Sequence, residues 1–210
     1  LWHGGTSLAA LCITLGYVVG IPLTIVLAGR DGTPAHPDGE TPPWRVAGAV
    51  WGSVLLLYVL TLAPSTAMWD ASEYIAAAKV LGIPHPPGNP MFVLLAHSFA
   101  LLPVPLSFAG RVNLLAATTS ALSAAFWFLV AYRSMRGWQI NRTPRTVIAV
   151  AASWIGATSF TVWNQSVVNE KVYTVAMLGL AASAWCALQW RDAEPGSRRA
   201  TSLLVLITYL

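Results

Sequence analysis

Two carboxylates three positions apart are the residues in this sequence best suited to chemistry. Asp70 and Glu73 follow a long apolar block, and on a helix their i,i+3 spacing would place them on one face. Carboxylates at a membrane boundary are costly to bury and tend to mark a functional site. Partial loss of water would raise the pKa of such a group and improve it as a general base. A structural alternative stays open, because Asp70 could instead cap the Ala-rich helix expected over 74–82.

A proline-rich segment follows the two acids and contains one ionisable side chain. Four prolines in the eight positions 83–90 fix φ and prevent a regular helix, while Gly88 supplies a permissive backbone position. His85 would then be held by rigid backbone close to the acids. There it could orient a carboxylate or bind a phosphate as imidazolium. The simpler interpretation is a stiff connector that seats the helix starting at Met91.

Arg111 and Asn113 open the apolar block over 112–132. The arginine could hold a phosphate through paired N–H donors, or its side chain could extend to lipid headgroups. A second polar loop contains Glu170 and Lys171 and ends at Tyr173, an aromatic residue typical of membrane interfaces. Glu170 could help to line one cavity with the two acids, although adjacent opposite charges usually form only a solvated pair.

The composition predicts an all-α, multi-pass membrane protein. Hydrophobic residues make up 56% of the chain and charged residues 10%, whereas a soluble domain carries about 25% charged residues. Apolar blocks that could each span a bilayer as one helix lie at 8–28, 46–63, 112–132, 147–163 and 172–190, and another begins near 201. There is no Gly-rich phosphate loop, no Cys/His metal spacing and no basic stripe interleaved with aromatics. We therefore expect the lipid bilayer as a partner, and no metal, cofactor or nucleic acid.

The placement of arginines predicts the orientation of these spans. The loops 133–145 and 191–199 are rich in arginine and should be cytoplasmic by the positive-inside rule. The loop 164–171 then lies outside. A span over 91–108 would leave only three residues before the next one, and Pro103 and Pro105 would break it. We therefore expect a short interfacial helix there, inside one large non-cytoplasmic loop over 64–110 that carries both acids.

Two segments are expected along the chain. Residues 1–45 would form an extra N-terminal span, which Pro22 should kink, followed by a cytoplasmic loop. Residues 46–210 would form the N-terminal part of a larger transmembrane domain, because the sequence stops within an apolar run.

Several of these motifs together resemble a known family. They are Trp69-Asp70-Ala71-Ser72-Glu73-Tyr74, then Gly82-Ile83-Pro84-His85-Pro86-Pro87-Gly88-Asn89-Pro90, then Arg111-Val112-Asn113. The combination is similar to the glycosyltransferase 117 family, the domain-of-unknown-function 2723 group, which includes the transmembrane protein 260 type of protein O-mannosyltransferases. The resemblance covers roughly residues 46 to 190. Glu170, Tyr173 and Thr174 match a Glu-Val-Tyr-Thr-like motif of the family, but Lys171 stands within it, and Asn89 stands where an aromatic is expected.

The resemblance implies a GT-C-type helical bundle that uses a sugar on a polyprenyl phosphate in a bacterial inner membrane or an endoplasmic-reticulum-like membrane. It also implies an inverting transfer to an acceptor hydroxyl of a protein or glycan. By this resemblance, Asp70 is the expected catalytic base and Glu73 its partner. The expected substrate-binding residues are His85, Pro86, Pro87, Gly88, Arg111, Asn113, Glu170 and Tyr173.

Two other classes of function stay open on the sequence. A transporter or flippase would bind a lipid-linked sugar without cleaving it, and it should carry ionisable residues within its spans. The complete spans here are almost free of charge, which favours chemistry at the membrane boundary, because a mid-span acid costs about 2.5–3.5 kcal/mol. A purely structural membrane subunit would leave the acids and the proline-rich loop as caps and turns.

Overall fold

The computed structural model describes residues 4–30, 40–66 and 70–210, and the regular elements within them are all helices, joined by turns and loops. The elements in chain order are α1 (Gly4–Leu15), a π-helical segment (Gly16–Gly20), α2 (Ile21–Ala28), α3 (Trp44–Leu60), α4 (Ala71–Val80), α5 (Pro90–Ala100), α6 (Phe108–Ser134), a 3₁₀ turn (Met135–Gly137), α7 (Arg142–Thr158), α8 (Phe160–Val167), α9 (Tyr173–Arg191) and α10 (Arg198–Tyr209). The all-α prediction is confirmed. Most of the predicted loop 29–44 lies outside the described residues, as does Trp69.

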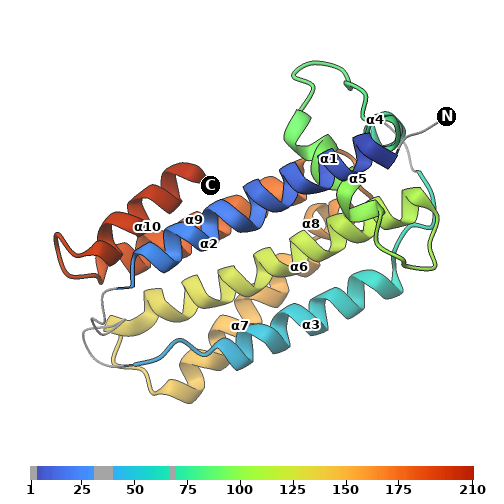
Figure 1. Ribbon diagram of the computed structural model, residues 1–210. Coiled ribbons are helices and arrows are strands. Elements are labelled where there is room, and N and C mark those ends of the chain that lie inside the picture. Colours follow the sequence, from blue (N-terminus) through green and yellow to red (C-terminus); the bar gives the residue numbers. More distant parts are fainter. Residues whose placement is uncertain (1–3, 31–39, 67–69) are drawn as a thin grey trace.

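The long helices run roughly parallel to one another in an elongated bundle (Figure 1). Helix α6 forms its centre and packs against α3, α7 and α9. Its buried face is rich in Ala and Ser, and such small side chains allow neighbouring helix backbones to approach closely. Helix α3 places Ala47, Val50, Val54 and Tyr58 in one buried stripe at helical spacing. Tyr58 also donates a hydrogen bond to the carbonyl of Ala157 at 2.8 Å, which ties α3 to α7.

The predicted N-terminal span is a single helix that contains a π-helical turn. The backbone N–H of Ile21 bonds to the carbonyl of Gly16 just before Pro22. Proline lacks an N–H and its ring crowds the preceding turn, so the wider turn accommodates it within a continuous helix. Thr6–Ala28 is long and apolar enough to cross a membrane. The span is attached to the rest of the bundle, because Ser7 contacts His97 and Ser98 donates to Thr14.

The span predicted over 147–163 is not one continuous helix in the structure. Helices α7 and α8 meet at Ser159 with a bend of 65°. Ser159 has φ −59° and ψ 141°, outside the helical region, so the backbone turns there. Within the described residues, two helices are long and apolar enough to cross a membrane, Thr6–Ala28 and Phe108–Gly137, and the bent pair would make a third. The spans expected over 46–63 and 172–190 stay predictions.

The expected short helix after the proline-rich loop is α5, with eleven residues. Pro90 occupies its first turn, where a missing N–H costs nothing. The helix ends at Ala100, and Pro103 and Pro105 follow in the turn before α6. Helices α4 and α5 lie together near the start of α6 (Figure 1). We call this end of the bundle the Asp70 end; it carries residues 61–66, 70–73, 101–111 and 167–173.

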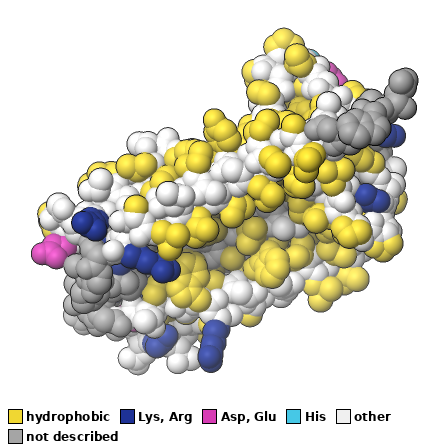
Figure 2. Space-filling view, in the orientation of Figure 1, with side chains coloured by type: hydrophobic (Ala, Val, Ile, Leu, Met, Phe, Trp, Pro, Cys, Tyr) yellow, Lys and Arg dark blue, Asp and Glu magenta, His cyan; other side chains and the backbone are white. Residues whose placement is uncertain are grey.

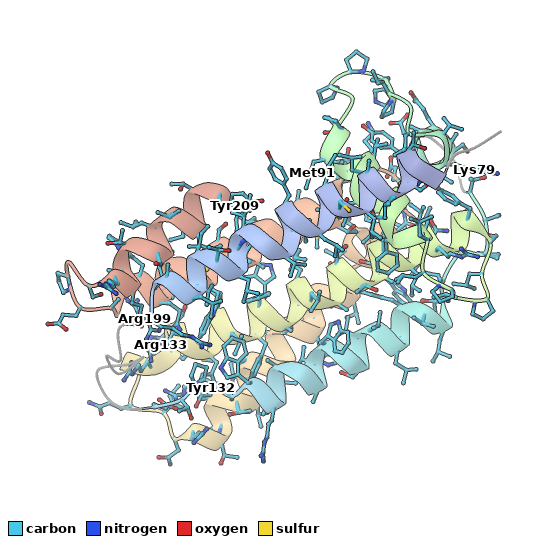
Figure 3. The ribbon with its side chains drawn as sticks, in the orientation of Figure 1. Lys79, Met91, Tyr132, Arg133, Arg199 and Tyr209 are labelled. Carbon is cyan, nitrogen blue, oxygen red and sulfur yellow. The ribbon has the colours of Figure 1, made fainter. Side chains whose placement is uncertain are left out.

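The basic residues are distributed unevenly along the bundle. Figure 3 shows Lys79 at the Asp70 end, whereas Arg133 and Arg199 lie at the opposite end, which we call the arginine end. In the view of Figure 2, hydrophobic side chains cover the middle of the surface and basic side chains gather mainly at the arginine end. Ion pairs at this end join Arg133 and Arg191 to Asp192, and Arg145 to Glu40. The charge distribution required by the orientation prediction is thus present in the folded chain.

Candidate functional site

Asp70 stands at the first position before α4, but its carboxylate does not cap that helix. No hydrogen bond joins the Asp70 side chain to a backbone N–H of the first turn. The reason is local: Asp70 has φ −77° and ψ −4°, a helical conformation, whereas a capping residue normally adopts extended angles. The capping alternative from the sequence is therefore wrong, and the carboxylate is available to other partners.

Glu73 contacts His85 at two points, through the backbone and through the ring. The backbone N–H of His85 donates to Glu73 Oε1 at 2.6 Å, and His85 Nδ1 lies 2.8 Å from Glu73 Oε2. Because a carboxylate only accepts hydrogen bonds, we place a proton on His85 Nδ1. His85 Nε2 then faces Asp70 Oδ2 at 3.9 Å. The expected closeness of His85 to both acids is present in the structure.

Several contacts around the proline-rich segment hold His85 in place. Gly88 has φ +80°, a conformation that glycine adopts without steric cost. The ring of Tyr74 packs edge-on against His85 and also against Phe92. Asn89 donates a hydrogen bond to the Tyr74 hydroxyl at 2.7 Å. Position 89 is thus used as a polar link between the loop and α4.

Lys171 is the site residue whose role the sequence reasoning missed. Its ammonium lies 2.6 Å from Asp70 Oδ2, so it pairs with an acid far away in the chain rather than with the adjacent Glu170. Glu170 instead accepts a hydrogen bond from Gln165. The only signal in the sequence was the insertion of a lysine into the family-like Glu-Val-Tyr motif.

Asn113 connects the two segments that carry Asp70 and Lys171. Its Nδ2 donates to the carbonyls of Ala63 and Ser65 at 2.9 and 3.0 Å, and its Oδ1 accepts the backbone N–H of Asn169 at 3.0 Å. The Asn113 side chain is fully buried, and its bond with Asn169 is buried as well. The contacts give Asn113 a positioning role; direct substrate binding by it stays a prediction.

The remaining predicted binding residues lie at the same end of the bundle. Arg111 donates from Nε to the carbonyl of Leu106 and from Nη1 to that of Ala100, which fixes the turn between α5 and α6. Tyr173 is exposed at the start of α9. The structure shows no contact of Arg111 with the two acids. Phosphate binding by Arg111 and substrate binding by Tyr173 stay predictions.

Hydrogen bonding sets the charge of both acids. The hydrogen bond from Lys171 lowers the pKa of Asp70, and the hydrogen bonds from His85 lower the pKa of Glu73. Asp70 in turn raises the pKa of Lys171. Both carboxylates are therefore ionised at neutral pH, and the ammonium group of Lys171 lies beside Asp70.

An apolar groove of about 360 Å³ begins next to these charged residues. It lies between the start of α5 and the start of α9, and its lining is Asn89, Pro90, Met91, Phe92, Leu95, Val172, Val175 and Ala176. Val172 directly follows Lys171, and Phe92 touches the tyrosine that packs on His85. The groove therefore borders the group formed by Asp70, Glu73, His85 and Lys171, which we call the charged cluster.

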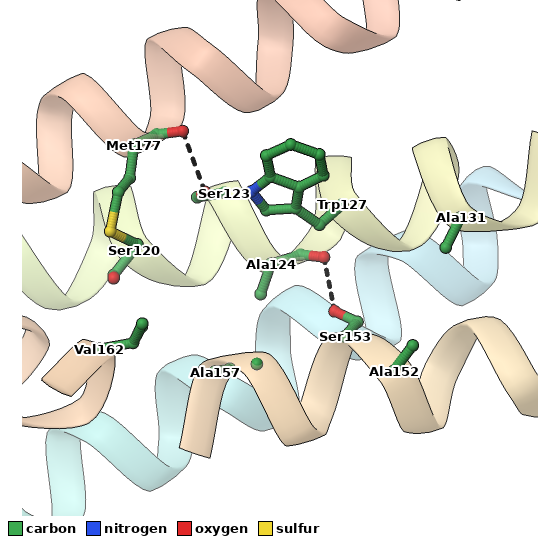
Figure 4. A pocket seen from close by; sticks show the side chains of 11 residues that line it. Ser120, Ser123, Ala124, Trp127, Ala131, Ala152, Ser153, Ala157, Val162 and Met177 are labelled. Carbon is green, nitrogen blue, oxygen red and sulfur yellow. Dashed lines mark hydrogen bonds between the residues drawn. The ribbon is translucent and has the colours of Figure 1, made fainter. Parts of the chain in front are cut away.

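A second cavity, of about 370 Å³, lies deeper in the bundle between α6, α7, α8 and α9. Figure 4 shows its serines bonded to neighbouring helices: Ser123 to the carbonyl of Met177 and Ser153 to that of Ala124. Its polar groups thus already serve helix packing, and it is separate from the charged cluster.

The ligand atoms of Asp70, Glu73 and His85 lie within 4.8 Å of one another, close enough in principle to surround a metal ion. Their donor atoms already have partners, however. The ammonium of Lys171 lies against Asp70, and Glu73 is engaged by His85. The expectation of a site without a metal stays a prediction, and we assign no metal to it.

The fold and site together define a helical membrane protein with a paired carboxylate–lysine cluster at one end of its bundle. The chain belongs to the family described as the protein O-mannosyl-transferase TMEM260 N-terminal domain, whose model matches residues 70–210. This confirms the family resemblance seen in the motifs, and the match begins at the proposed base itself.

Two curated relatives carry the same name. The protein O-mannosyl-transferase TMEM260 of Mus musculus is 41% identical over 113 residues, which is 51% of this chain and 16% of the relative. The protein O-mannosyl-transferase tmem260 of Dictyostelium discoideum is 32% identical over 83 residues, which is 38% of this chain and 10% of the relative. The chain thus matches less than a fifth of the length of either relative. No solved structure matches it.

Proposed function

We propose that this chain forms the donor-side part of the active site of a membrane glycosyltransferase. The reaction moves a mannose-like sugar from a polyprenyl phosphate to a hydroxyl group, such as that of a protein Ser or Thr, at the non-cytoplasmic face. The observation that carries this proposal is the ionised Asp70 carboxylate, which lies between His85 and Lys171 beside an apolar groove. The names of the two relatives support the sugar and the acceptor class.

The proposed reaction is a single displacement. An Asp70 carboxylate oxygen takes the proton of the acceptor hydroxyl, and the acceptor oxygen attacks the anomeric carbon of the sugar. The bond between that carbon and the phosphate oxygen breaks, and its electron pair leaves with the polyprenyl phosphate. Attack from the face opposite the leaving group inverts the anomeric centre. A nearby cation stabilises the charge that develops on the phosphate.

The other cluster residues support this base. Glu73 holds His85 through one contact to its ring and one to its backbone N–H, and the ring lies 3.9 Å from Asp70. The apolar groove suits an isoprenoid chain, because its lining is almost entirely hydrophobic. The donor would thus place its lipid in the groove and its phosphate at the charged border. The GT-C fold is part of the same proposal.

The test is sugar transfer by the full-length protein in membranes, with polyprenyl-phosphate mannose as donor and a Ser/Thr peptide as acceptor. Asp70→Asn should lower the turnover about 10²- to 10⁴-fold, the usual contribution of a general base. Ser72→Ala, an exposed change in the same helix turn, serves as the matched control. Near-normal turnover of a correctly inserted Asp70→Asn protein would remove Asp70 from the mechanism. Movement of the lipid-linked sugar across the membrane without cleavage would indicate a transporter instead.

A further inference from the structure

Lys171 lies between Asp70 and the apolar groove, and no other described cation does so. Its ammonium contacts Asp70 Oδ2 at 2.6 Å, and the next residue, Val172, lines the apolar groove. A lysine head carries three N–H donors on a flexible stem. Its side chain is about a quarter exposed, at 27%, so solvent or a ligand can reach the ammonium. Lys171 is therefore placed to reach an anion at the border of the groove.

The resting arrangement is unsuited to the proposed proton transfer. A carboxylate that holds an ammonium offers one fewer free lone pair to an acceptor hydroxyl. The same contact lowers the pKa of Asp70, which makes it a weaker base. For catalysis, Asp70 must be released from Lys171, and the ammonium must find another anion.

Arg111 does not meet this requirement as directly. Its Nε and Nη1 donors are bound to the carbonyls of Leu106 and Ala100. A new contact to a phosphate through these atoms would cost the hydrogen bonds that hold the α5–α6 turn. Lys171 exchanges one anion for another without breaking a backbone contact.

We propose that Lys171 binds the phosphate of the lipid-linked donor and leaves Asp70 when that phosphate enters, so that donor binding frees the base. This inference rests on the proposed function. When the anomeric C–O bond breaks, the electron pair goes to the phosphate oxygen, and Lys171 stabilises the additional negative charge there. The proton of the acceptor goes to Asp70, which is by then free to receive it.

The first test is binding, which needs no sugar transfer. The full-length protein in phosphatidylcholine nanodiscs is titrated with undecaprenyl phosphate. Lys171→Met should weaken binding roughly 10- to 100-fold, the equivalent of one charge-assisted hydrogen bond. Lys171→Arg should restore most of the affinity. Lys79→Met, a change of an exposed lysine at the same end of the bundle, is the matched control and should bind as the wild type does.

The outcomes separate the alternatives. Wild-type affinity in Lys171→Met would overturn the proposal. Equal, Lys171-dependent binding of phosphatidic acid would assign the lysine to bilayer phosphate and overturn its donor role. Absence of sugar transfer in the wild type would defeat the proposed function, while the binding result would still decide the phosphate-binding part on its own.

The second test uses the pH dependence of transfer. Among the described residues, the titratable groups that face Asp70 are Glu73 from α4, His85 from the proline-rich segment and Lys171 from the α8–α9 connection. The profile of kcat/KM reports the free enzyme and that of kcat the donor complex. In the wild type, the acid limb of kcat should lie at higher pH than that of kcat/KM, because Lys171 has left Asp70. In Lys171→Met the two limbs should coincide, and coinciding limbs in the wild type would overturn the proposal.

Discussion

Asn113 Oδ1 accepts a hydrogen bond from the backbone N–H of Asn169 at 3.0 Å, and this contact joins the start of α6 to the loop that carries Lys171. The same side chain holds the segment 63–65 that leads to Asp70, while Asn169 leads to Lys171 two residues later. A buried amide at the start of α6 thus links the chain that precedes Asp70 to the chain that precedes Lys171.

Replacing Asn113 with Leu should destabilise the protein and reduce its activity. The change leaves the N–H of the buried Asn169 without a partner and removes the donor to the carbonyls of Ala63 and Ser65, which together costs roughly 2–4 kcal/mol. Unfolding of the full-length protein in detergent measures the loss. The control is Thr118→Val, because that hydroxyl bonds only to the carbonyl of Leu114 within its own helix. If Asn113→Leu proves as stable as Thr118→Val, the positioning role of Asn113 is wrong.

The contact between Glu73 and His85 should weaken at acidic pH. Hydrogen bonds from His85 lower the pKa of Glu73 below its ordinary value of 4.5. The contact therefore adds full stability above that ordinary value and loses it as pH falls through the lowered pKa. Hydrogen exchange at the His85 amide, corrected for the intrinsic rate at each pH, measures the change.

Glu73→Gln provides the matched variant for that measurement. Its amide oxygen can still accept the backbone N–H of His85, but the side chain no longer titrates. Protection of the His85 amide in this variant should be independent of pH across the acidic range. A wild-type profile equally independent of pH would contradict the assigned contact.

Filling the apolar groove should weaken use of the lipid donor. Ala176 lines the groove and is exposed, so Ala176→Trp adds bulk without crowding the buried core. The KM for polyprenyl-phosphate mannose should rise about tenfold, equivalent to a loss of about 1.4 kcal/mol in donor binding. The KM for the acceptor peptide should stay constant. Leu180→Trp, on the same helix but outside the groove lining, is the control, and an equal effect there would contradict the assignment.

Labelling of single cysteines should place the two ends of the bundle on opposite sides of the membrane. In a background with Cys12→Ser, Ser72→Cys lies at the Asp70 end and Glu194→Cys at the arginine end, and both positions are exposed. The buried Cys186 should remain unlabelled. An impermeant maleimide added from the non-cytoplasmic side should label Ser72→Cys and should label Glu194→Cys only after permeabilisation. The reverse pattern would place the cluster in the cytosol and rule out the proposed site.

Several features of the fold could be predicted because they are local. The Ala-rich run after Glu73 favours α4, the prolines before Met91 prevent a helix there, and Gly88 adopts the positive φ that its lack of a side chain permits. The break at Ser159 was missed because hydropathy stays high on both sides of it, and serine alone is no helix breaker. Hydropathy records which segments are apolar, but it does not record a change in backbone direction.

The amino-acid sequence by itself determined the class of the protein, the family motifs and the closeness of Asp70, Glu73 and His85, since these residues lie within sixteen positions of one another, 70 to 85. Only the tertiary structure decided that Asp70 pairs with Lys171 rather than capping its helix, and that Asn113 holds both segments together. The physical reason is that sequence periodicity fixes neighbours along one helix. Contacts between residues far apart in the chain depend on how the helices pack and on which buried polar groups find partners across them.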